Sequence, residues 1–486
     1  MYPFKVKHLG KTEVYTLYAP SQTSRTEWCE SIVSAKTSHA HALLRQNAEP
    51  FRLKVLADTA FGYDSLAGMY RRTVIRGTPL DRAITEVEER YVGQNRPGPV
   101  CRATVNCATA FYHPPGRLMC AIGTDYGVYF SEYDNPRGWA RVSRCIYLHE
   151  PCADARQAIQ MTRVTQMAVF EEFNLFLLIS DKSLIAYHLD AVCSPSGTAR
   201  PPNDASARKA PQKLSGNKDV GFFATGRMKD RALVFYKKRD GISSTFKVLE
   251  PILQKSTSTR SRFMPTPARR GQTDFFREFD EFYIPAECYG INLFHSSLAV
   301  STARGVEVLT LDKKHPWSVP NLESEQPEAQ LHLSSIANRI KDLKPLGMFR
   351  LSEAEFLVAF EECAVYVNKH GDVSRGVVME FVGRATSACL YGQHLILFDN
   401  DFVEIRNAMN GRMKQVIAGK DIKMLDDGGG SNTIRPTNGG LGGGMNGLGL
   451  QGYGAAPRSV KISMQHPEIE RNVVVVELIE NEGTRE

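Results

Sequence analysis

The sequence lacks a secretory signal peptide, an N-x-[ST] glycosylation sequon and an apolar run long enough to cross a bilayer. A membrane-spanning helix needs about 20 consecutive apolar residues, and the longest apolar runs here are far shorter. We therefore expect a cytoplasmic protein whose contact with a membrane is peripheral. The ten cysteines form no C-x-x-C pair. Several of them, including Cys107, Cys120 and Cys363, lie in apolar runs, which indicates buried free thiols in a reducing compartment.

Motifs that carry chemistry are also missing. No set of cysteines and histidines has the spacing of a metal site, and no G-x-S-x-G elbow occurs. Gly10 and Lys11 resemble the end of a P-loop, but Lys5 stands where the first glycine of that motif is required. The G-x-G-x-x-G match that begins at Gly442 lies in a glycine-rich stretch and follows no expected strand. The sequence therefore indicates a non-catalytic protein without a cofactor or a metal ion.

The net charge of the 486-residue chain is only mildly positive, at +7 from 60 basic and 53 acidic residues. A dedicated nucleic-acid-binding protein concentrates its basic residues in one stripe, whereas here the only strongly basic stretch is 255–270. We expect no nucleic-acid partner, and we interpret this stretch as a solvated loop that contacts an anionic surface or is regulated by phosphorylation. The loop residues concerned are Arg260, Arg262, Thr266, Arg269 and Arg270.

What the sequence has instead is a repeated hairpin pattern. An apolar strand, a tight polar turn and a second strand with alternating apolar positions return six times, at spacings of roughly 40 to 60 residues. The six hairpins span residues 118–130, 175–189, 232–249, 298–311, 356–368 and 395–406. Residues 460–464 and 472–479 supply strands for a seventh unit. We therefore expect a mainly β fold, a seven-bladed β-propeller, with a large β-sandwich as the alternative.

The first 48 residues differ from this pattern. Two short strands are expected there, followed by a helix that carries Trp28 and begins with a capping box of Ser24 and Glu27. Two strands and one helix bury little apolar surface by themselves. We therefore interpret this small α+β portion as the end of a larger domain.

Breaks in the pattern divide the rest of the chain. A strand is expected over 51–56 and a short helix from Thr78 to Arg90, before a proline-rich break that begins at Pro97. We assign residues 49–96 to a linker or packing segment and residues 97–482 to the propeller. Three insertions in the propeller are too polar or too glycine-rich to fold alone. These expected loops span residues 194–212, 255–273 and 426–454.

Several segments carry a resemblance to a known family. Residues that resemble the citron homology domain are 122–129, 164–166, 171–175, 180–189, 282–285, 363–368 and 465–467. The similarity runs from about residue 101 to residue 478 and includes turns as well as core positions. Within that family, the chain most resembles fungal exchange factors for Rho-type GTPases that act in cell-wall integrity signalling. Residues 1–48 resemble the last strands and the C-terminal helix of a pleckstrin homology domain.

The resemblance implies a regulatory and docking role. In that family a Dbl homology domain performs nucleotide exchange, and this chain has no counterpart of it, so exchange activity is not expected. The propeller would bind a Rho-type GTPase or an upstream signalling protein and help to place the exchange factor at the plasma membrane. An acidic partner surface would favour basic groups at hairpin turns. The candidate partner-binding residues are Lys182, Lys237, Lys238, Arg239, Lys369 and His370.

Three alternatives stay open. The propeller could bind anionic lipid through residues 255–270, or it could act only as a structural or autoinhibitory part without GTPase contact. It could also be a propeller hydrolase that uses paired carboxylates such as Glu171 and Glu172, although these lie in an expected turn.

Overall fold

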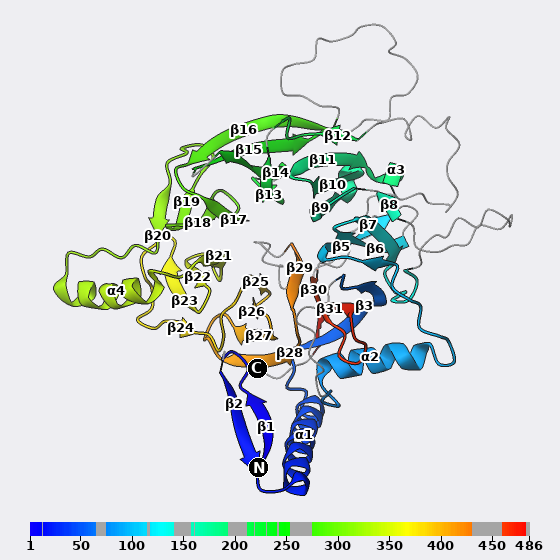
Figure 1. The fold of residues 1–486 in the computed structure, drawn as a ribbon. Coiled ribbons are helices and arrows are strands. Elements are labelled where there is room, and N and C mark those ends of the chain that lie inside the picture. The colour runs from blue at the N-terminus through cyan, green and yellow to red at the C-terminus, as the bar shows by residue number, and fades with distance from the viewer. Residues whose placement is uncertain are drawn as a thin grey trace, which may run out of the picture.

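Seven β-sheets are arranged in a ring, and a β-hairpin with a long helix extends from one side of this ring (Figure 1). The computed structural model describes residues 1–11, 13–64, 74–113, 117–139, 157–159, 161–192, 211–217, 219–229, 231–240, 243–252, 275–429 and 459–482. The mainly β, seven-bladed propeller expected from the repeats is confirmed. Among the described residues, no helix combines the length and the apolar character that a membrane span requires.

Each of the first six blades is an antiparallel meander of four strands. Blade 1 consists of β5 (Val105–His113), β6 (Arg117–Thr124), β7 (Gly127–Glu132) and β8 (Gln157–Ile159). Blade 2 consists of β9 (Val164–Phe170), β10 (Leu175–Ser180), β11 (Ser183–His188) and β12 (Gln212–Lys213), with the short helices η1 (Glu171–Phe173) and α3 (Leu189–Val192) in its connections. Blade 3 consists of β13 (Val220–Met228), β14 (Arg231–Asp240), β15 (Ser243–Pro251) and β16 (Phe276–Ile284).

The other three regular blades follow the same plan. Blade 4 consists of β17 (Cys288–Leu293), β18 (Leu298–Thr302), β19 (Gly305–Leu309) and β20 (Trp317–Val319). Blade 5 consists of β21 (Pro345–Arg350), β22 (Glu355–Phe360), β23 (Cys363–Asn368) and β24 (Met379–Glu380). Blade 6 consists of β25 (Ser387–Tyr391), β26 (His394–Phe398), β27 (Phe402–Asn407) and β28 (Met413–Ala418).

The first strand of each blade faces the centre of the ring and contacts the first strands of its neighbours. Apolar side chains fill the space between successive blades, because each sheet is apolar on both faces there. Between blades 1 and 2, for example, the rings of Phe130 and Phe176 meet edge to face with their centroids 5.8 Å apart. This packing makes a rigid ring whose connecting turns are free to vary in sequence.

Blade 7 closes the ring by combining strands from near the two ends of the chain, residues 51–102 and residues 423–480. Its order is β29 (Lys423–Asp427), β30 (Val460–Gln465), β31 (Asn472–Glu480), β3 (Phe51–Gly62) and β4 (Cys101–Arg102). The strand β3 pairs antiparallel with β31, and β4 pairs parallel with β3. Residues 49–96 were expected to be a linker or packing segment, yet they contain a strand of the ring. The difference arises because local sequence shows that a strand forms but not which distant strand it pairs with.

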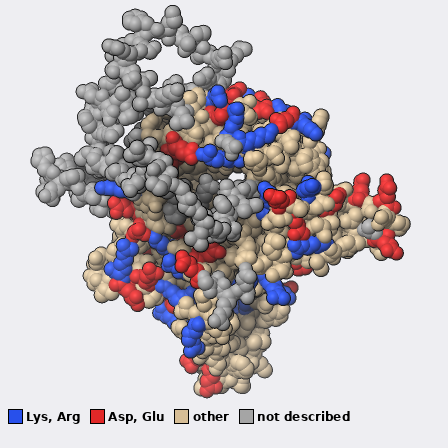
Figure 2. Space-filling view, turned by 180° about the vertical axis from the view of Figure 1, so that it is seen from behind, with Lys and Arg blue, Asp and Glu red and all other residues tan. Residues whose placement is uncertain are grey.

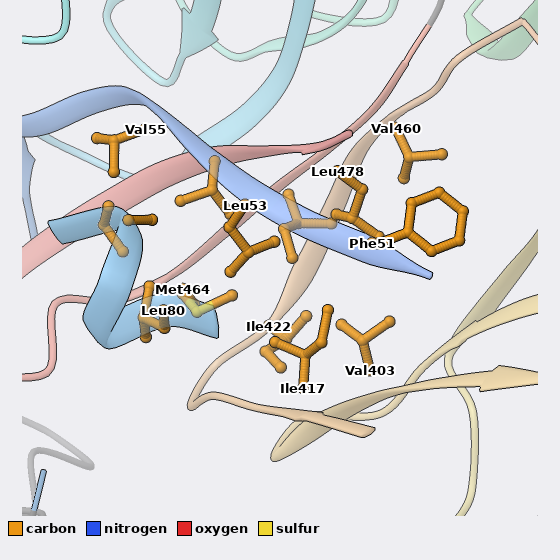
Figure 3. Close-up of a cluster of buried hydrophobic side chains, with 14 of the residues drawn as sticks. Phe51, Leu53, Val55, Leu80, Val403, Ile417, Ile422, Val460, Met464 and Leu478 are labelled. Carbon is orange, nitrogen blue, oxygen red and sulfur yellow. The ribbon is translucent and has the colours of Figure 1, made fainter. Parts of the chain in front are cut away.

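Apolar contacts and buried polar bonds hold β3 in place. Phe51 and Leu53 pack with Val403 and Ile417 of blade 6 (Figure 3). The side chain of Gln415 bonds both backbone groups of Phe51, at 3.0 Å and 2.9 Å. Helix α2 (Pro79–Arg90), which begins after Thr78 as expected, lies against β3. The closing strand is therefore fixed on both sides.

The N-terminal portion stands away from the ring. It consists of β1 (Tyr2–Lys7), β2 (Val14–Ala19) and α1 (Gln22–Arg45). The helix is capped by Ser21, whose hydroxyl accepts from the Ser24 N–H at 3.0 Å, so the expected capping box at Ser24 is wrong by three residues. Lys7 forms an ion pair with Asp401 of blade 6. Large apolar side chains of the hairpin and the helix stay exposed, namely Tyr2, Val6, Val14, Tyr15, Leu17, Tyr18, Trp28 and Leu44.

A further helix, α4 (Pro327–Ile340), was not expected from the sequence. It is inserted between β20 and β21 and projects from the rim of the ring (Figure 1). Ile336 and Ile340 are buried in the apolar cluster that joins blades 4 and 5. These two side chains fix the C-terminal half of the helix to the propeller.

Candidate partner-binding surface

The turns of a propeller fall on two opposite faces, because each strand runs the length of its blade. The turns that join the second and third strands of the blades gather on one of them, which we call the hairpin face. The described hairpin-face turns hold Asp125 and Tyr126, Asp181 and Lys182, Ala303 and Arg304, Glu361 and Glu362, Asp399 to Asp401, and Pro467 to Glu470. The third strand of each blade starts at the hairpin face, so the residues that follow its end lie on the opposite face of the propeller.

Two of the candidate residues are neighbours on the hairpin face. Lys182 lies in the tight turn of blade 2 with a positive φ of 61°. Its backbone carbonyl accepts from the N–H of Val220 at 2.7 Å, and Val220 is the register partner of Lys238 in blade 3. The ammonium group of Lys182 lies 3.1 Å from a carboxylate oxygen of Asp219. Lys182 and Lys238 therefore border one surface across the junction of blades 2 and 3.

The prediction that Lys237 contacts a partner is wrong. Its side chain is buried, and its ammonium group donates to the backbone carbonyl of Cys288 at 2.8 Å. The expected turn at residues 239–241 comes too early, because β14 continues through Asp240. Side chains alternate along a strand, so Lys237 points toward blade 4 while Lys238, on the other side of β14, is half-exposed. Arg239 lies in β14, and its side chain is outside the described part of the molecule.

Lys369 and His370 do not join this surface. Both are exposed, but they follow the far end of the third strand of blade 5 and so lie on the opposite face from Lys182. The turn is held by Asn368, whose side-chain oxygen accepts from the N–H groups of His370 at 2.8 Å and Asp372 at 3.1 Å. The loop residues Arg260, Arg262, Thr266, Arg269 and Arg270 lie outside the described residues.

A pocket of about 660 Å³ opens beside Lys182, between blades 1 and 2. Its lining includes Tyr126, Asp181, Ser183 and Lys213, and the Tyr126 side chain is 54% exposed. Sequence reasoning missed Tyr126 and Lys213 as surface candidates. The tyrosine could have been found, since it occupies the turn of the first hairpin, whereas Lys213 comes from the short outer strand β12 and gave no signal.

The hairpin-face turns of blades 5 and 6 differ from that of blade 2. They carry carboxylates that form ion pairs with basic side chains of the chain itself. Glu361 pairs with Arg384 at 2.6 Å, and Glu362 pairs with Arg339 of α4 at 3.3 Å. Asp401 pairs with Lys7 of the N-terminal hairpin. Figure 2 shows Lys and Arg side chains interspersed with Asp and Glu side chains over the ring on the visible face.

Metal-ligand clusters and reactive thiols are the next features of the described residues to consider. Among them, no group of three or more histidine, cysteine or acidic side chains is placed to hold a metal ion. Burial raises the pKa of the Cys107, Cys120 and Cys363 thiols to about 12, so these cysteines are not thiolate nucleophiles at neutral pH.

The chain is similar in sequence to two exchange factors of a yeast. The chain is 29% identical to Rho1 guanine nucleotide exchange factor 3 of Schizosaccharomyces pombe over 448 residues, which cover 87% of this chain and 32% of that protein. It is 28% identical to Rho1 guanine nucleotide exchange factor 1 of the same yeast, covering 88% of this chain and 26% of that protein. The chain thus spans about a third or less of the length of these relatives.

A solved structure shares the fold. The AfRom2 CNH domain matches 77% of this chain and 94% of its own length, with a TM-score of 0.53 and 24% sequence identity. The family model of the CNH domain matches residues 116–428, which include blades 2 to 6 and most of blade 1. The resemblance to the citron homology domain is thereby confirmed, and the chain belongs to the CNH domain family.

Proposed function

We propose that this chain is a non-catalytic regulatory and protein-interaction module of a Rho-type exchange factor, and that it binds a Rho-type GTPase directly. The observation that carries the proposal is the match to Rho1 guanine nucleotide exchange factors along 87% and 88% of the chain. A closed propeller supports it, because a rigid ring presents turns on a fixed frame without needing an active site.

The surface that fits such a partner lies at the hairpin face of blades 1 to 3. Tyr126 supplies a large exposed ring beside a pocket, and tyrosine is among the residues that contribute most to binding energy at interfaces. Lys213 lines the same pocket, and Lys182 and Lys238 lie where blades 2 and 3 face each other. Their ammonium groups would complement acidic side chains of a partner and speed association.

The test is binding of the purified chain to a Rho-type GTPase in three states: loaded with GDP, loaded with a GTP analogue, and stripped of nucleotide. Tyr126→Ala should weaken binding about 30-fold, the value expected for an interface hot spot of about 2 kcal/mol. Lys182→Glu combined with Lys238→Glu should weaken it at least tenfold and reduce its salt dependence. Lys369→Glu is the matched control, because this exposed lysine lies on the opposite face.

The outcomes separate the alternatives. Binding that prefers one nucleotide state and falls in the hairpin-face variants supports the proposal. Binding that only Lys369→Glu weakens moves the site to the other face. Absence of binding in every state at concentrations up to about 100 μM refutes direct docking, since the interaction would then be weaker than about −5.5 kcal/mol.

We further propose that residues 1–48 are the end of a pleckstrin-homology-like domain. The apolar side chains that β1, β2 and α1 leave exposed support this, since a two-stranded hairpin is marginal without further strands to cover it. Radical footprinting should show oxidation of Tyr15, Tyr18 and Trp28 in this chain and protection in a longer chain that supplies the preceding strands. Equal oxidation in both would refute the assignment.

A further inference from the structure

The hairpin-face turn of blade 2 holds a strained lysine. The loop between β10 and β11 consists of Asp181 and Lys182 alone, with φ angles of 44° and 61°. Two-residue loops in which both residues have positive φ favour Asn-Gly or Asp-Gly, because glycine adopts this conformation without a steric clash. The hairpin-face turns of blades 1 and 4 place Gly127 and Gly305 at positive φ. Blade 2 instead carries a lysine side chain at the position that favours glycine.

Neighbouring segments fix the backbone of this turn. The carbonyl of Lys182 accepts from the N–H of Val220 in blade 3 at 2.7 Å, and the hydroxyl of Thr162, before β9, donates to the carboxylate of Asp181. A strained residue persists only where the surrounding structure determines its conformation, and such residues cluster at functional sites. The Lys182 side chain takes no part in these bonds and is 55% exposed. The strain therefore points to a use for the lysine side chain and not for the turn itself.

An aspartate of the same chain already pairs with this lysine. Asp219, directly before β13, places a carboxylate oxygen 3.1 Å from the ammonium group of Lys182, and within the described residues neither side chain forms another ion pair. Both side chains are more than half exposed, so their pair contributes little to stability and is readily exchanged. A partner that brings its own carboxylate to Lys182 has to displace Asp219 first.

We propose that Lys182 is the residue through which the hairpin face recognises an acidic side chain of its partner, and that Asp219 competes with that side chain for Lys182. This inference rests on the proposed function, because it assigns roles within the surface proposed to dock the GTPase. Asp219 holds the ammonium group in the free chain and repels an incoming carboxylate. The two residues therefore act in opposite directions: Lys182 raises the affinity for the partner, and Asp219 lowers it.

The test measures the association and dissociation rates of the purified chain with the Rho-type GTPase, in the nucleotide state that binds best, by surface plasmon resonance. Lys182→Gly should slow association about fivefold at low salt and less at high salt, since salt screens the attraction between charges. Asp219→Asn should strengthen binding about threefold. In the Lys182→Gly background the same change at Asp219 should alter the affinity by less than about twofold, because the lysine for which it competes is gone.

Stability measurements separate a lost contact from a damaged fold. Lys182→Gly should not lower the urea midpoint, because glycine relieves the strain at this φ. Lys182→Gln removes the charge but keeps a long side chain, and it should slow association to the same extent as Lys182→Gly. A lower urea midpoint for Lys182→Gly would contradict the strain, and unchanged association of Lys182→Gln would refute the role of the charge.

A similar pair on the opposite face provides the control. Lys229 also has a positive φ, of 46°, is 56% exposed and pairs with the exposed Asp312 at 2.6 Å. It lies in the turn between the first and second strands of blade 3, away from the hairpin face. Lys229→Gly and Asp312→Asn should therefore change the affinity and the association rate by less than about twofold. Changes as large as those at Lys182 and Asp219 would overturn the proposal.

Other outcomes distinguish this proposal from GTPase docking itself. If Tyr126→Ala weakens GTPase binding while Lys182→Gly leaves it unchanged, docking stands and the role of Lys182 is refuted. Weaker binding of Asp219→Asn refutes the competition, since Asp219 would then be among the groups that contact the partner. Absence of binding by the native chain in all three nucleotide states refutes docking and this proposal together.

Discussion

Replacing Phe51 by alanine tests whether residues that precede the repeats close the ring. Phe51 is the first residue of β3 and is fully buried. Its ring meets Tyr391 and His394 of blade 6 edge to face, with centroid separations of 5.7 Å and 5.2 Å. Both of its backbone groups are bonded by Gln415. The substitution therefore removes a contact between blades 6 and 7 without changing the backbone bonds.

The expected loss is large. Truncating a buried phenylalanine to alanine costs about 3–5 kcal/mol, because the lost transfer energy is joined by the cost of the cavity. A folded domain is stable by only about 5–15 kcal/mol, so this change removes a substantial share of it. Trp28→Ala is the matched control, since this aromatic side chain is 58% exposed on α1 and its removal should change stability by less than about 1 kcal/mol.

Two measurements decide the matter. Urea denaturation should give a lower midpoint for Phe51→Ala than for Trp28→Ala, with the slope unchanged. Native-state hydrogen exchange should show faster exchange in β31 as well as in β3, because the two strands are register partners from Phe51 with Glu480 to Gly62 with Asn472. If β3 were only a packing segment, its own amides would exchange faster while those of β31 stayed protected. That result, or a loss below about 1 kcal/mol, would refute the closure.

Two further predictions concern pH and thiol reactivity. Burial by itself would raise the pKa of Asp58, but hydrogen bonds from His466 and Arg137 outweigh it and the pKa lies below its ordinary value. The ionised group thus contributes stability above about pH 4 that is lost as the pH falls through the folded-state pKa, so thermal midpoints should drop more steeply between about pH 4 and pH 2 in the native chain than in Asp58→Asn. An equal slope in the two proteins would contradict this. Alkylation with iodoacetamide at pH 7.5, mapped by mass spectrometry, should modify the partly exposed Cys29 before the buried Cys107, Cys120 and Cys363, whose pKa values burial raises to about 12. Equal or faster modification of the buried three would show that the ring opens readily.

The sequence predicted the ring well because hairpins are local. Each apolar strand and its turn lie within about 15 residues, so the alternation of side chains and the turn residues together indicate the pairing. The pairing of β3 with β31 joins residues more than 400 positions apart, and no local pattern carries that information. The helix α4 was missed for a related reason. It has 14 residues, and contacts with distant parts of the chain, such as the packing of Ile336 and Ile340 on blades 4 and 5, stabilise it.

Single candidate residues were harder to predict than the fold. Lys237 and Lys238 both lie inside β14, which runs through Asp240, and the alternation of side chains along the strand turns Lys237 toward blade 4. The turn residues expected at 239–241 gave no sign that the strand is this long. Lys182 and Lys369 both lie in turns that follow apolar strands, but the turn of Lys182 follows the second strand of its blade and that of Lys369 follows the third. The position of a strand within its blade decides on which face of the propeller the following turn lies. That position is known only once every strand of the blade has been assigned.

The ion pairs of the hairpin face also favour one half of it for partners. Asp401 is 15% exposed and Glu361 is 18% exposed, and each is bonded by a basic side chain of the chain itself. A partner would have to break those partly buried pairs and leave a charge without compensation, which is costly. The pair of Lys182 with Asp219 is 55% and 52% exposed, so it contributes little stability and exchanges readily for a pair with another protein. The carboxylates of blades 5 and 6 therefore hold α4 and the N-terminal hairpin. Under the proposed function, the exposed pair of Lys182 with Asp219 is the one that a partner would replace at the lower cost.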